Sequence, residues 1–401
     1  MRLPVVFILI TVMIDAMGVG LMIPVMPDLI QEVTGGDLAN AALWGGVLAT
    51  VFAVMQFLFG PVIGNLSDRF GRRPVLLISL VVMAADYVVM AVAGSIWLLL
   101  IGRVIGGITS ATQSTASAYM ADISDPDKKA QNFGLVGAAF GLGFVIGPLM
   151  GGVLGEWGTR APFWAAAGLA AANAVLGYFV LRETVTDSIR RPFEWARANP
   201  LGAFKSLGRF PGLGRLFAVF FLYQVAFFVY PAIWAYYGQA RFGWNAGMIG
   251  LSLGLFGIMM AVVQGGLIRV ILARLGTRGT VIYGLVFDIF AFGALAFVTS
   301  GTIALILTPL AALGAVITPA LQGIMSEAVG DKRQGELQGA LTSVGAVAMI
   351  VSPMIMTSVF AQFTGVEAVV YFPGAPFLVS LALIVLALIV FLSPRHFAVT
   401  A

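Results

Sequence analysis

The chain of 401 residues has no cysteine and only one histidine, His396. Disulfide bonds, thiolate metal ligands and cysteine nucleophiles are therefore excluded, and a histidine metal centre has no support. The sequence also lacks the G-x-x-x-x-G-K-[ST] phosphate loop and the H-E-x-x-H zinc motif, so nucleotide hydrolysis and metallopeptidase chemistry have no visible site. We expect a protein that is not an enzyme and that needs no cofactor.

Charged residues are scarce, at 10% of the chain against about 25% in ordinary soluble domains. Hydrophobic residues make up 60%, and this composition places the chain in a lipid bilayer. The net charge of +4 does not indicate a nucleic-acid partner, because the basic residues fall in short loops beside apolar segments.

Twelve apolar segments are each long enough to cross a hydrocarbon core of about 30 Å as a helix. Six of them lie at residues 5–27, 41–66, 74–94, 97–121, 131–154 and 161–181. Six more lie at residues 215–237, 246–268, 279–299, 302–326, 337–361 and 373–392. Between the two sets, residues 182–214 are rich in arginine and proline, which is typical of a linker. We predict an all-α integral membrane protein with twelve transmembrane helices, in which residues 1–181 and 215–401 form two six-helix bundles.

The basic residues predict the orientation of the chain. Of the 22 lysines and arginines, all but Arg103, Arg160 and Arg241 lie in the termini or loops of one predicted side. The positive-inside rule places this side, with both termini and the linker, in the cytoplasm, and we expect a multi-pass protein of the cell inner membrane. The segment 5–27 carries Asp15 and no small-residue cleavage site, so it is predicted to be the first span and not a signal peptide.

The two predicted bundles look like copies of one repeat. An offset of 205 places residues 69–73, with the pattern R-x-G-x-R, on residues 274–278, which have the same pattern. The same offset brings Asp86 to within about one helical turn of Asp288. Two six-helix pseudo-repeats in parallel orientation are the layout of major facilitator transporters.

Four ionisable residues lie inside predicted spans, where each costs about 2.5 to 3.5 kcal/mol on insertion scales. They are Asp15, Asp86, Asp288 and Arg103. One arginine cannot pair with three acids, so at least one carboxylate has no basic partner and can take up and release a proton. Asp288 is the first candidate, since its own span has no base. Either of the other two acids can be the partner of Arg103, and a purely structural ion pair remains the alternative.

Several uncharged residues are weaker candidates for a binding or gating role. Gln56 and Gln264 occupy comparable places in the two halves and either face a wet cavity or bridge helices. The predicted loop 64–73 either latches one conformation or anchors the cytoplasmic side. Gly147, Pro148 and Gly151 form a small-residue face that packs helices closely or gates the pathway. Three aromatic residues near the end of the seventh span, residues 234–237, are typical of an interfacial belt.

Several of these segments resemble a known family. Residues 64–74, GNLSDRFGRRP, resemble the signature loop of the major facilitator superfamily, and residues 143–152, GFVIGPLMGG, resemble its antiporter signature. Residues 101–107, IGRVIGG, are similar to the fourth-span signature whose arginine is linked to proton transfer. Residues 118–125, 319–323 and 334–339 resemble the twelve-span tetracycline/proton antiporters.

The resemblance implies roles for individual residues. It implies that the three membrane acids are needed for transport, that Asp68 and Arg72 belong to a gating loop, and that Arg103 and Asp122 are functional. Gln56 and Gln264 also fall on the family pattern. We therefore predict proton coupling for the three acids and Arg103, gating for Gly64, Asp68, Arg72, Asp122 and the span-five residues, and substrate binding for Gln56, Gln264 and Met260. Met260 stands where the resembled tetracycline exporters carry a histidine, four residues before the glutamine. The resemblance therefore supports drug/proton antiport better than it supports tetracycline or its magnesium chelate as the cargo.

We expect a proton-coupled antiporter that exports amphipathic drugs by alternating access, with tetracycline-like compounds among the candidate cargoes. Its partners are then a small-molecule drug, protons and lipid, and we expect a monomer. A proton-coupled symporter that imports a small nutrient shares the fold and the acids and is the alternative. A membrane receptor without transport is a third class, in which several midplane acids have no purpose.

Overall fold

The computed structural model describes residues 3–110, 112–187, 190–195, 199–200, 202, 210, 212–330 and 333–393. His396 and much of the predicted linker lie outside these residues. In the first half, the α-helices are α1 (Leu3–Met22), α2 (Met26–Thr34), α3 (Leu38–Phe70), α4 (Arg72–Val92), α5 (Ile96–Thr109), α6 (Thr112–Ile123), α7 (Lys129–Gly155) and α8 (Ala161–Val180).

The second half of the chain repeats this pattern of long apolar helices. Its α-helices are α10 (Gly214–Phe227), α11 (Val229–Phe242), α12 (Ala246–Val262), α13 (Ile268–Phe297), α14 (Gly301–Ala311), α15 (Ile317–Val329), α16 (Gln334–Thr364) and α17 (Ala375–Leu392). A π-helical turn, η2 (Val263–Leu267), joins α12 to α13, and a 3₁₀ segment, η3 (Ala312–Val316), joins α14 to α15.

Eleven helical stretches in the described residues are long and apolar enough to cross a membrane. The longest runs over residues 246–297, 52 residues, and contains a sharp break at Gly276, where the backbone has φ 66° and ψ 172°. The break divides this stretch into two spans, which gives twelve. The all-α, twelve-span fold predicted from the sequence is confirmed.

The predicted loop 64–73 is wrong in its secondary structure, because residues 64–70 continue helix α3. Only Gly71 interrupts the helices, with φ 111° and ψ 152°. A positive φ is costly for residues with a side chain and free for glycine. Gly276, the repeat equivalent of Gly71, also breaks its helix with a positive φ and an extended ψ, so the two halves share a glycine break as well as a sequence pattern.

The first span is also shorter than predicted. Helix α1 ends at Met22, and a turn at residues 23–25 starts the separate helix α2. Pro24 lies within this turn and Pro27 in the first turn of α2, and proline lacks the backbone N–H that a helix interior requires. The tail of the predicted span therefore forms a helix that contacts α3, α5 and α11.

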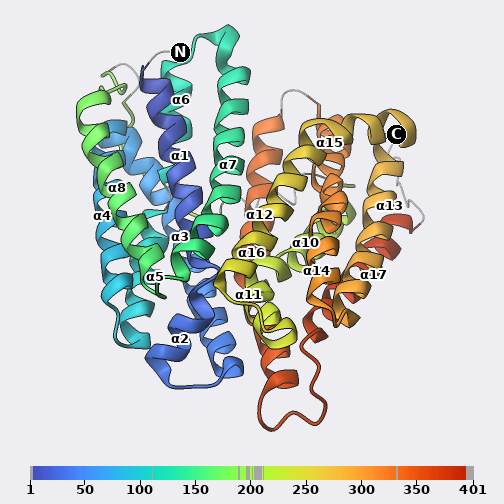
Figure 1. The fold of residues 1–401 in the computed structure, drawn as a ribbon. Helices are drawn as coiled ribbons and strands as arrows, with labels where there is room; N and C mark the ends of the chain where they lie inside the picture. The colour runs from blue at the N-terminus through green and yellow to red at the C-terminus, as the bar shows by residue number, and fades with distance from the viewer. Residues whose placement is uncertain are drawn as a thin grey trace.

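Helices α1 to α8 and helices α10 to α17 gather in two groups that lie side by side (Figure 1). We call the end of the molecule that carries the start of α1 and residues 67–73 and 124–129 the basic face, and the opposite end, with α2 and residues 364–375, the far face. The two groups meet where α3 packs against α16 and α7 packs against α12. We call these two helix pairs the seam.

The seam is tight toward the far face and open toward the basic face. Thr50 donates a hydrogen bond to the carbonyl of Ile350 across it, at 3.1 Å. A Cβ atom added to Gly152 would lie 2.7 Å from the carbonyl oxygen of Ala246. Near the basic face, by contrast, added Cβ atoms at Gly134 or Gly339 would meet nothing within 4 Å. The structure is therefore a conformation closed at the far face.

Candidate functional site

Arg103 is placed beside Asp86 and not beside the other two membrane acids. Its Nη2 atom lies 3.7 Å from Oδ2 of Asp86, and both side chains are buried, with 8% and 3% exposure. Gly102 and Gly106 of α5 leave room for the carboxylate, which contacts the helix surface there. The guanidinium also lies over the ring of Phe52, 5.2 Å from its centroid. The structure thus selects Asp86 as the partner that the sequence left open.

This pair is loosely bonded. Oδ1 of Asp86 and Nε of Arg103 are buried and have no hydrogen-bond partner. Buried ion pairs that lack such bonds gain little stability, although removal of one partner leaves a costly isolated charge. Separation of the pair would therefore leave two buried charges without partners, which is costly.

We predict that Arg103→Gln lowers the folding stability by about 3 to 5 kcal/mol, because it leaves the Asp86 carboxylate buried without a cation. Adding Asp86→Asn removes that charge and is expected to restore the melting temperature and the membrane level of the protein. The double variant should still fail to transport if the pair takes part in proton transfer. A double variant that transports normally would show that the pair only supports the fold.

Asp288 and Asp15 have no cationic partner among the described residues. The carboxylate of Asp288 is 4% exposed and lies against Gly314 of η3, where no Cβ atom would fit. Tyr223 and Tyr230 lie close enough to experience its charge. Asp15 is half-buried in α1, and the hydroxyl of Tyr87 contacts the same helix one turn later, at Gly18. Two of the three predicted membrane acids are therefore free of an ion pair.

The candidate substrate residues differ in their surroundings. Gln56 in α3 is half-buried, and its Oε1 atom is buried without a hydrogen-bond partner. Gln264 is exposed within the π-helical turn η2, and Met260 is half-buried one turn earlier in α12. π-helical turns inside α-helices are frequent at functional sites. The two amides therefore differ, because the oxygen of Gln56 is buried without a partner and Gln264 is exposed.

The predicted gating residues Asp68, Arg72 and Asp122 gather into one cluster at the basic face. Arg72 forms an ion pair with Asp68 one turn before it, and its Nε atom lies 3.4 Å from Oδ2 of Asp122. Gly64, by contrast, faces open space, because an added Cβ atom there would meet nothing within 4 Å. The cluster joins α3, α4 and α6, so a movement of any of these helices changes it.

Glu183 is a member of this cluster that sequence reasoning missed. Its carboxylate accepts hydrogen bonds from the backbone N–H groups of Arg72, at 2.9 Å, and Arg73, at 3.2 Å. It thereby satisfies the N-terminus of α4, where a negative charge is favourable. Thr184 next to it donates to Asp122 at 2.9 Å. The available signal was an acid two residues after the sixth predicted span, in a segment that carries a net positive charge.

The span-five residues Gly147, Pro148 and Gly151 lie between α1 and α12. An added Cβ atom at Gly147 would lie 2.6 Å from the carbonyl oxygen of Met17, and Gly151 is equally close to the backbone of Leu21. The other side of the helix faces the seam, where Gly250 of α12 packs on the carbonyl of Pro148. One helix therefore serves both interpretations, because Gly147 and Gly151 pack closely on α1 while the carbonyl of Pro148 contacts α12 of the other half.

The predicted aromatic belt is wrong for the seventh span. Trp234 and Tyr237 have 0% exposure and pack with Phe377 in the interior of the second half. Residues 250–254 match the G-x-S-x-G pattern of serine hydrolases, but Ser252 is fully buried in α12 and accepts a hydrogen bond from Nε1 of Trp234, at 2.8 Å. The serine is a structural residue within a regular helix and not a nucleophile.

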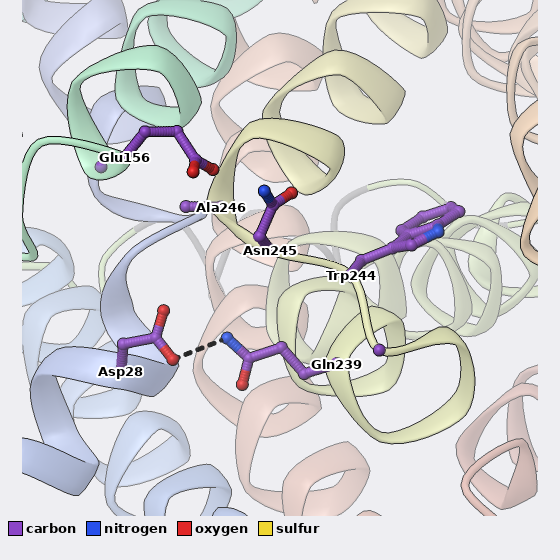
Figure 2. A pocket seen from close by; sticks show the side chains of 8 residues that line it. Asp28, Glu156, Gln239, Trp244, Asn245 and Ala246 are labelled. Carbon is purple, nitrogen blue, oxygen red and sulfur yellow. Dashed lines mark hydrogen bonds between the residues drawn. The ribbon is translucent and has the colours of Figure 1, made fainter.

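A cavity of about 390 Å³ lies at the far face where the two groups of helices meet (Figure 2). Asp28 and Glu156 line it from the first group, and Gln239 and Asn245 line it from the second. Gln239 donates a hydrogen bond to Oδ1 of Asp28 at 2.9 Å, which Figure 2 shows. None of these residues was singled out from the sequence, because the contact joins segments more than two hundred residues apart.

Two groups of six apolar helices, with acids buried midway along them and a seam that closes at one end, define a multi-pass membrane transporter. The sequence profile of the Major Facilitator Superfamily matches residues 8–353. The chain belongs to this family, so it is a transporter and not an enzyme, as predicted. The family that the sequence motifs indicated is therefore confirmed.

The similar proteins include resistance proteins of known name. The chain is 42% identical to the tetracycline resistance protein, class C, of Escherichia coli over 88% of each chain. It is 39% identical to the class G protein of Vibrio anguillarum, over 91% of this chain and 92% of that one. Among solved structures, the nucleoside transporter NupG matches with a TM-score of 0.77 at 12% identity, covering 98% of this chain and all of that one, which supports the fold.

Proposed function

We propose that the chain is a proton-coupled antiporter that exports amphipathic drugs across the cell inner membrane. The observation that carries this proposal is Asp288, a buried carboxylate midway along a span with no cationic partner in the described part of the chain, whose relatives include tetracycline resistance proteins. An isolated ionised carboxylate in such a position is costly, and a proton or a cationic group of the substrate removes that cost. Proton and drug can therefore compete for the same acid.

The transport cycle follows from this competition. In the conformation closed at the far face, drug binds from the basic face, which the positive-inside rule assigns to the cytoplasm together with both termini. The two halves, residues 1–181 and 215–401, then rock about the seam and open the far face. There, protons bind to Asp288 and Asp15 and release the drug. Return of the protonated protein delivers protons to the cytoplasm.

Other residues serve this cycle. The ion pairs of Arg72 hold the basic-face ends of three helices together in the present conformation. The buried Oε1 atom of Gln56 and the exposed amide of Gln264 supply hydrogen-bonding groups for the substrate. Each group is placed by a helix of a different half, so a substrate bound to both would bridge the halves.

Tetracycline-like compounds are candidate cargoes, and a magnesium chelate of such a compound is a substrate form and not a cofactor of the protein. In the described residues no group of three or more histidine or acidic side chains could hold a metal ion. Met260 supplies an apolar contact and no proton or metal ligand. The transporter is proposed to work as a monomer, because each chain contains both halves of the pathway.

Inverted membrane vesicles test the proposal. An acidic interior is expected to drive accumulation of a tetracycline or another amphipathic drug, and a protonophore should abolish it. A proton/nutrient symporter would instead release its cargo from such vesicles together with protons. Absence of proton-driven accumulation for every drug in a broad resistance profile would contradict antiport.

A further inference from the structure

The far-face cavity of Figure 2 contains two acids and no base. Asp28, from α2, and Glu156, which follows α7, both belong to the first half of the chain. The second half contributes uncharged groups to the same cavity, among them Gln239 and Asn245. The closed far face therefore concentrates negative charge without a positive side chain to balance it.

Both acids hold the second half by hydrogen bonds. Nε2 of Gln239 donates to Asp28 at 2.9 Å, and the backbone N–H of Gly247, in the first turn of α12, donates to Oε1 of Glu156 at 2.8 Å. Residue 245 caps the same helix with its side chain. These contacts lie at the outer end of the seam, so they form only when the far face is closed.

The neighbouring basic residues are engaged elsewhere. Arg241 donates from Nε to the carbonyl of Val298 at 3.0 Å, and Arg160 pairs with Glu32 at 2.8 Å. Asp37, the nearest further acid on α3, caps its own helix through the backbone N–H of residue 40. On the second half, Tyr236 of α11 is uncharged, and its hydroxyl lies against Gly45 of α3. Among the residues that the structure describes, no cation pairs with Asp28 to stabilise its ionised form.

Closure changes the proton affinity of this acid. Burial raises the pKa of Asp28; the hydrogen bond from Gln239 lowers it, and the negative charge of Glu156 raises it further. With the far face open, water reaches Asp28 and the pKa returns toward its ordinary value. A group that binds protons more tightly in the closed state favours closure when it is protonated. Acid therefore stabilises the closed far face, and ionisation of Asp28 as the pH rises favours opening.

We propose that Asp28 is a proton-sensing gate residue, whose protonation from the outer side closes the far face and whose ionisation releases it. This inference rests on the proposed function for its orientation and for the inward flow of protons. It adds a second proton-dependent step to the cycle, at the surface and apart from the midplane acids. Asp28 would take its proton from the acidic outer solution, and this protonation would return the transporter to the drug-accepting state.

A thiol reporter can measure the gate, because the chain has no cysteine of its own. Thr357 in α16 is fully buried against Gly46 of α3, at the seam. A Thr357→Cys reporter should react with a membrane-impermeant maleimide only when the far face opens. Its rate is divided by that of a Val369→Cys reporter, at a position that is 99% exposed, which corrects for the pH dependence of thiol chemistry. Right-side-out vesicles without drug or an ion gradient keep transport out of the measurement.

We expect the normalised rate to fall at least about threefold as the pH falls from about 8 to about 5, because the gate closes. Asp28→Asn removes the charge and should give a low, pH-independent rate. Gln239→Glu adds a third carboxylate beside Asp28, so the rate should rise above that of the parent at high pH and return at low pH. An unchanged pH response in Asp28→Asn would overturn the proposal, as would a Gln239→Glu rate equal to the parent at every pH.

Glu367→Gln is the matched control, since Glu367 is exposed in the far-face segment between α16 and α17 and does not line the cavity. It should retain the response of the parent. The same series in an Asp288→Asn background separates the two proposals, because the gate should respond to pH even when transport is lost. If the labelling rate responds to pH only in inverted vesicles, the proposed membrane orientation is wrong, but the role of Asp28 in closing the far face is supported.

Discussion

Replacement of Asp288 by asparagine is expected to abolish proton-driven drug accumulation in inverted vesicles. Asparagine keeps the size of the side chain but neither binds a proton nor carries a negative charge. The buried position then has no charge to exchange between a proton and a cationic substrate, and the coupling is lost completely. Drug uptake under an imposed pH gradient measures the effect, with the amount of protein in the membrane determined in the same vesicles.

The result is informative only if the variant still folds. Removing a buried charge that has no ion-pair partner relieves a cost, so the melting temperature should be unchanged or higher than that of the parent. Drug bound without a gradient should persist at least in part, because Gln56 and Gln264 remain. Transport at the parent rate in Asp288→Asn would contradict the role of this acid, and the Glu367→Gln variant serves as the control.

The positions of the membrane acids could be predicted because the bilayer makes charge expensive. Any aspartate deep in a twenty-residue apolar segment stands out from the sequence, and the repeat offset brought Asp86 close to Asp288. The choice of partner for Arg103 could not be predicted. It depends on the glycines of α5, which leave space for the carboxylate of Asp86, and this is a property of how α4 packs against α5.

The errors have a common origin in local patterns that tertiary packing overrides. Arginine and glycine near residue 70 indicated a loop, whereas only Gly71 has a non-helical conformation between α3 and α4. Aromatic residues near the end of a span indicated an interface with lipid headgroups, whereas Trp234 is enclosed by other aromatic rings. Glu183 and Asp28 were missed because each acts on a segment that is distant in sequence.

Substitution of Gly250 by alanine is expected to hold the far face open. An added Cβ atom would press directly on the carbonyl oxygen of Pro148, a backbone atom that cannot rotate away. Overpacking of this kind costs about 1 to 3 kcal/mol. Because the contact exists only across the closed seam, the cost falls on one conformation, and the equilibrium should shift roughly 5- to 150-fold toward the open far face.

The shift can be measured by labelling of the Thr357→Cys reporter from the outer side, which should increase in Gly250→Ala at all pH values. Drug transport should fall, since a protein that rarely closes its far face rarely returns to accept cytoplasmic drug. Gly168→Ala is the matched control, because Gly168 lies on an exposed face of α8 where an added Cβ atom meets nothing within 4 Å. Equal labelling of the two variants would mean that the backbone contact at Pro148 does not decide which face is open. A higher labelling rate in Gly250→Ala alone would mean that the close contact between the backbones of α7 and α12 determines which face is open. Glycine is then required for this close approach, and the ionisable groups only shift the equilibrium between the two conformations.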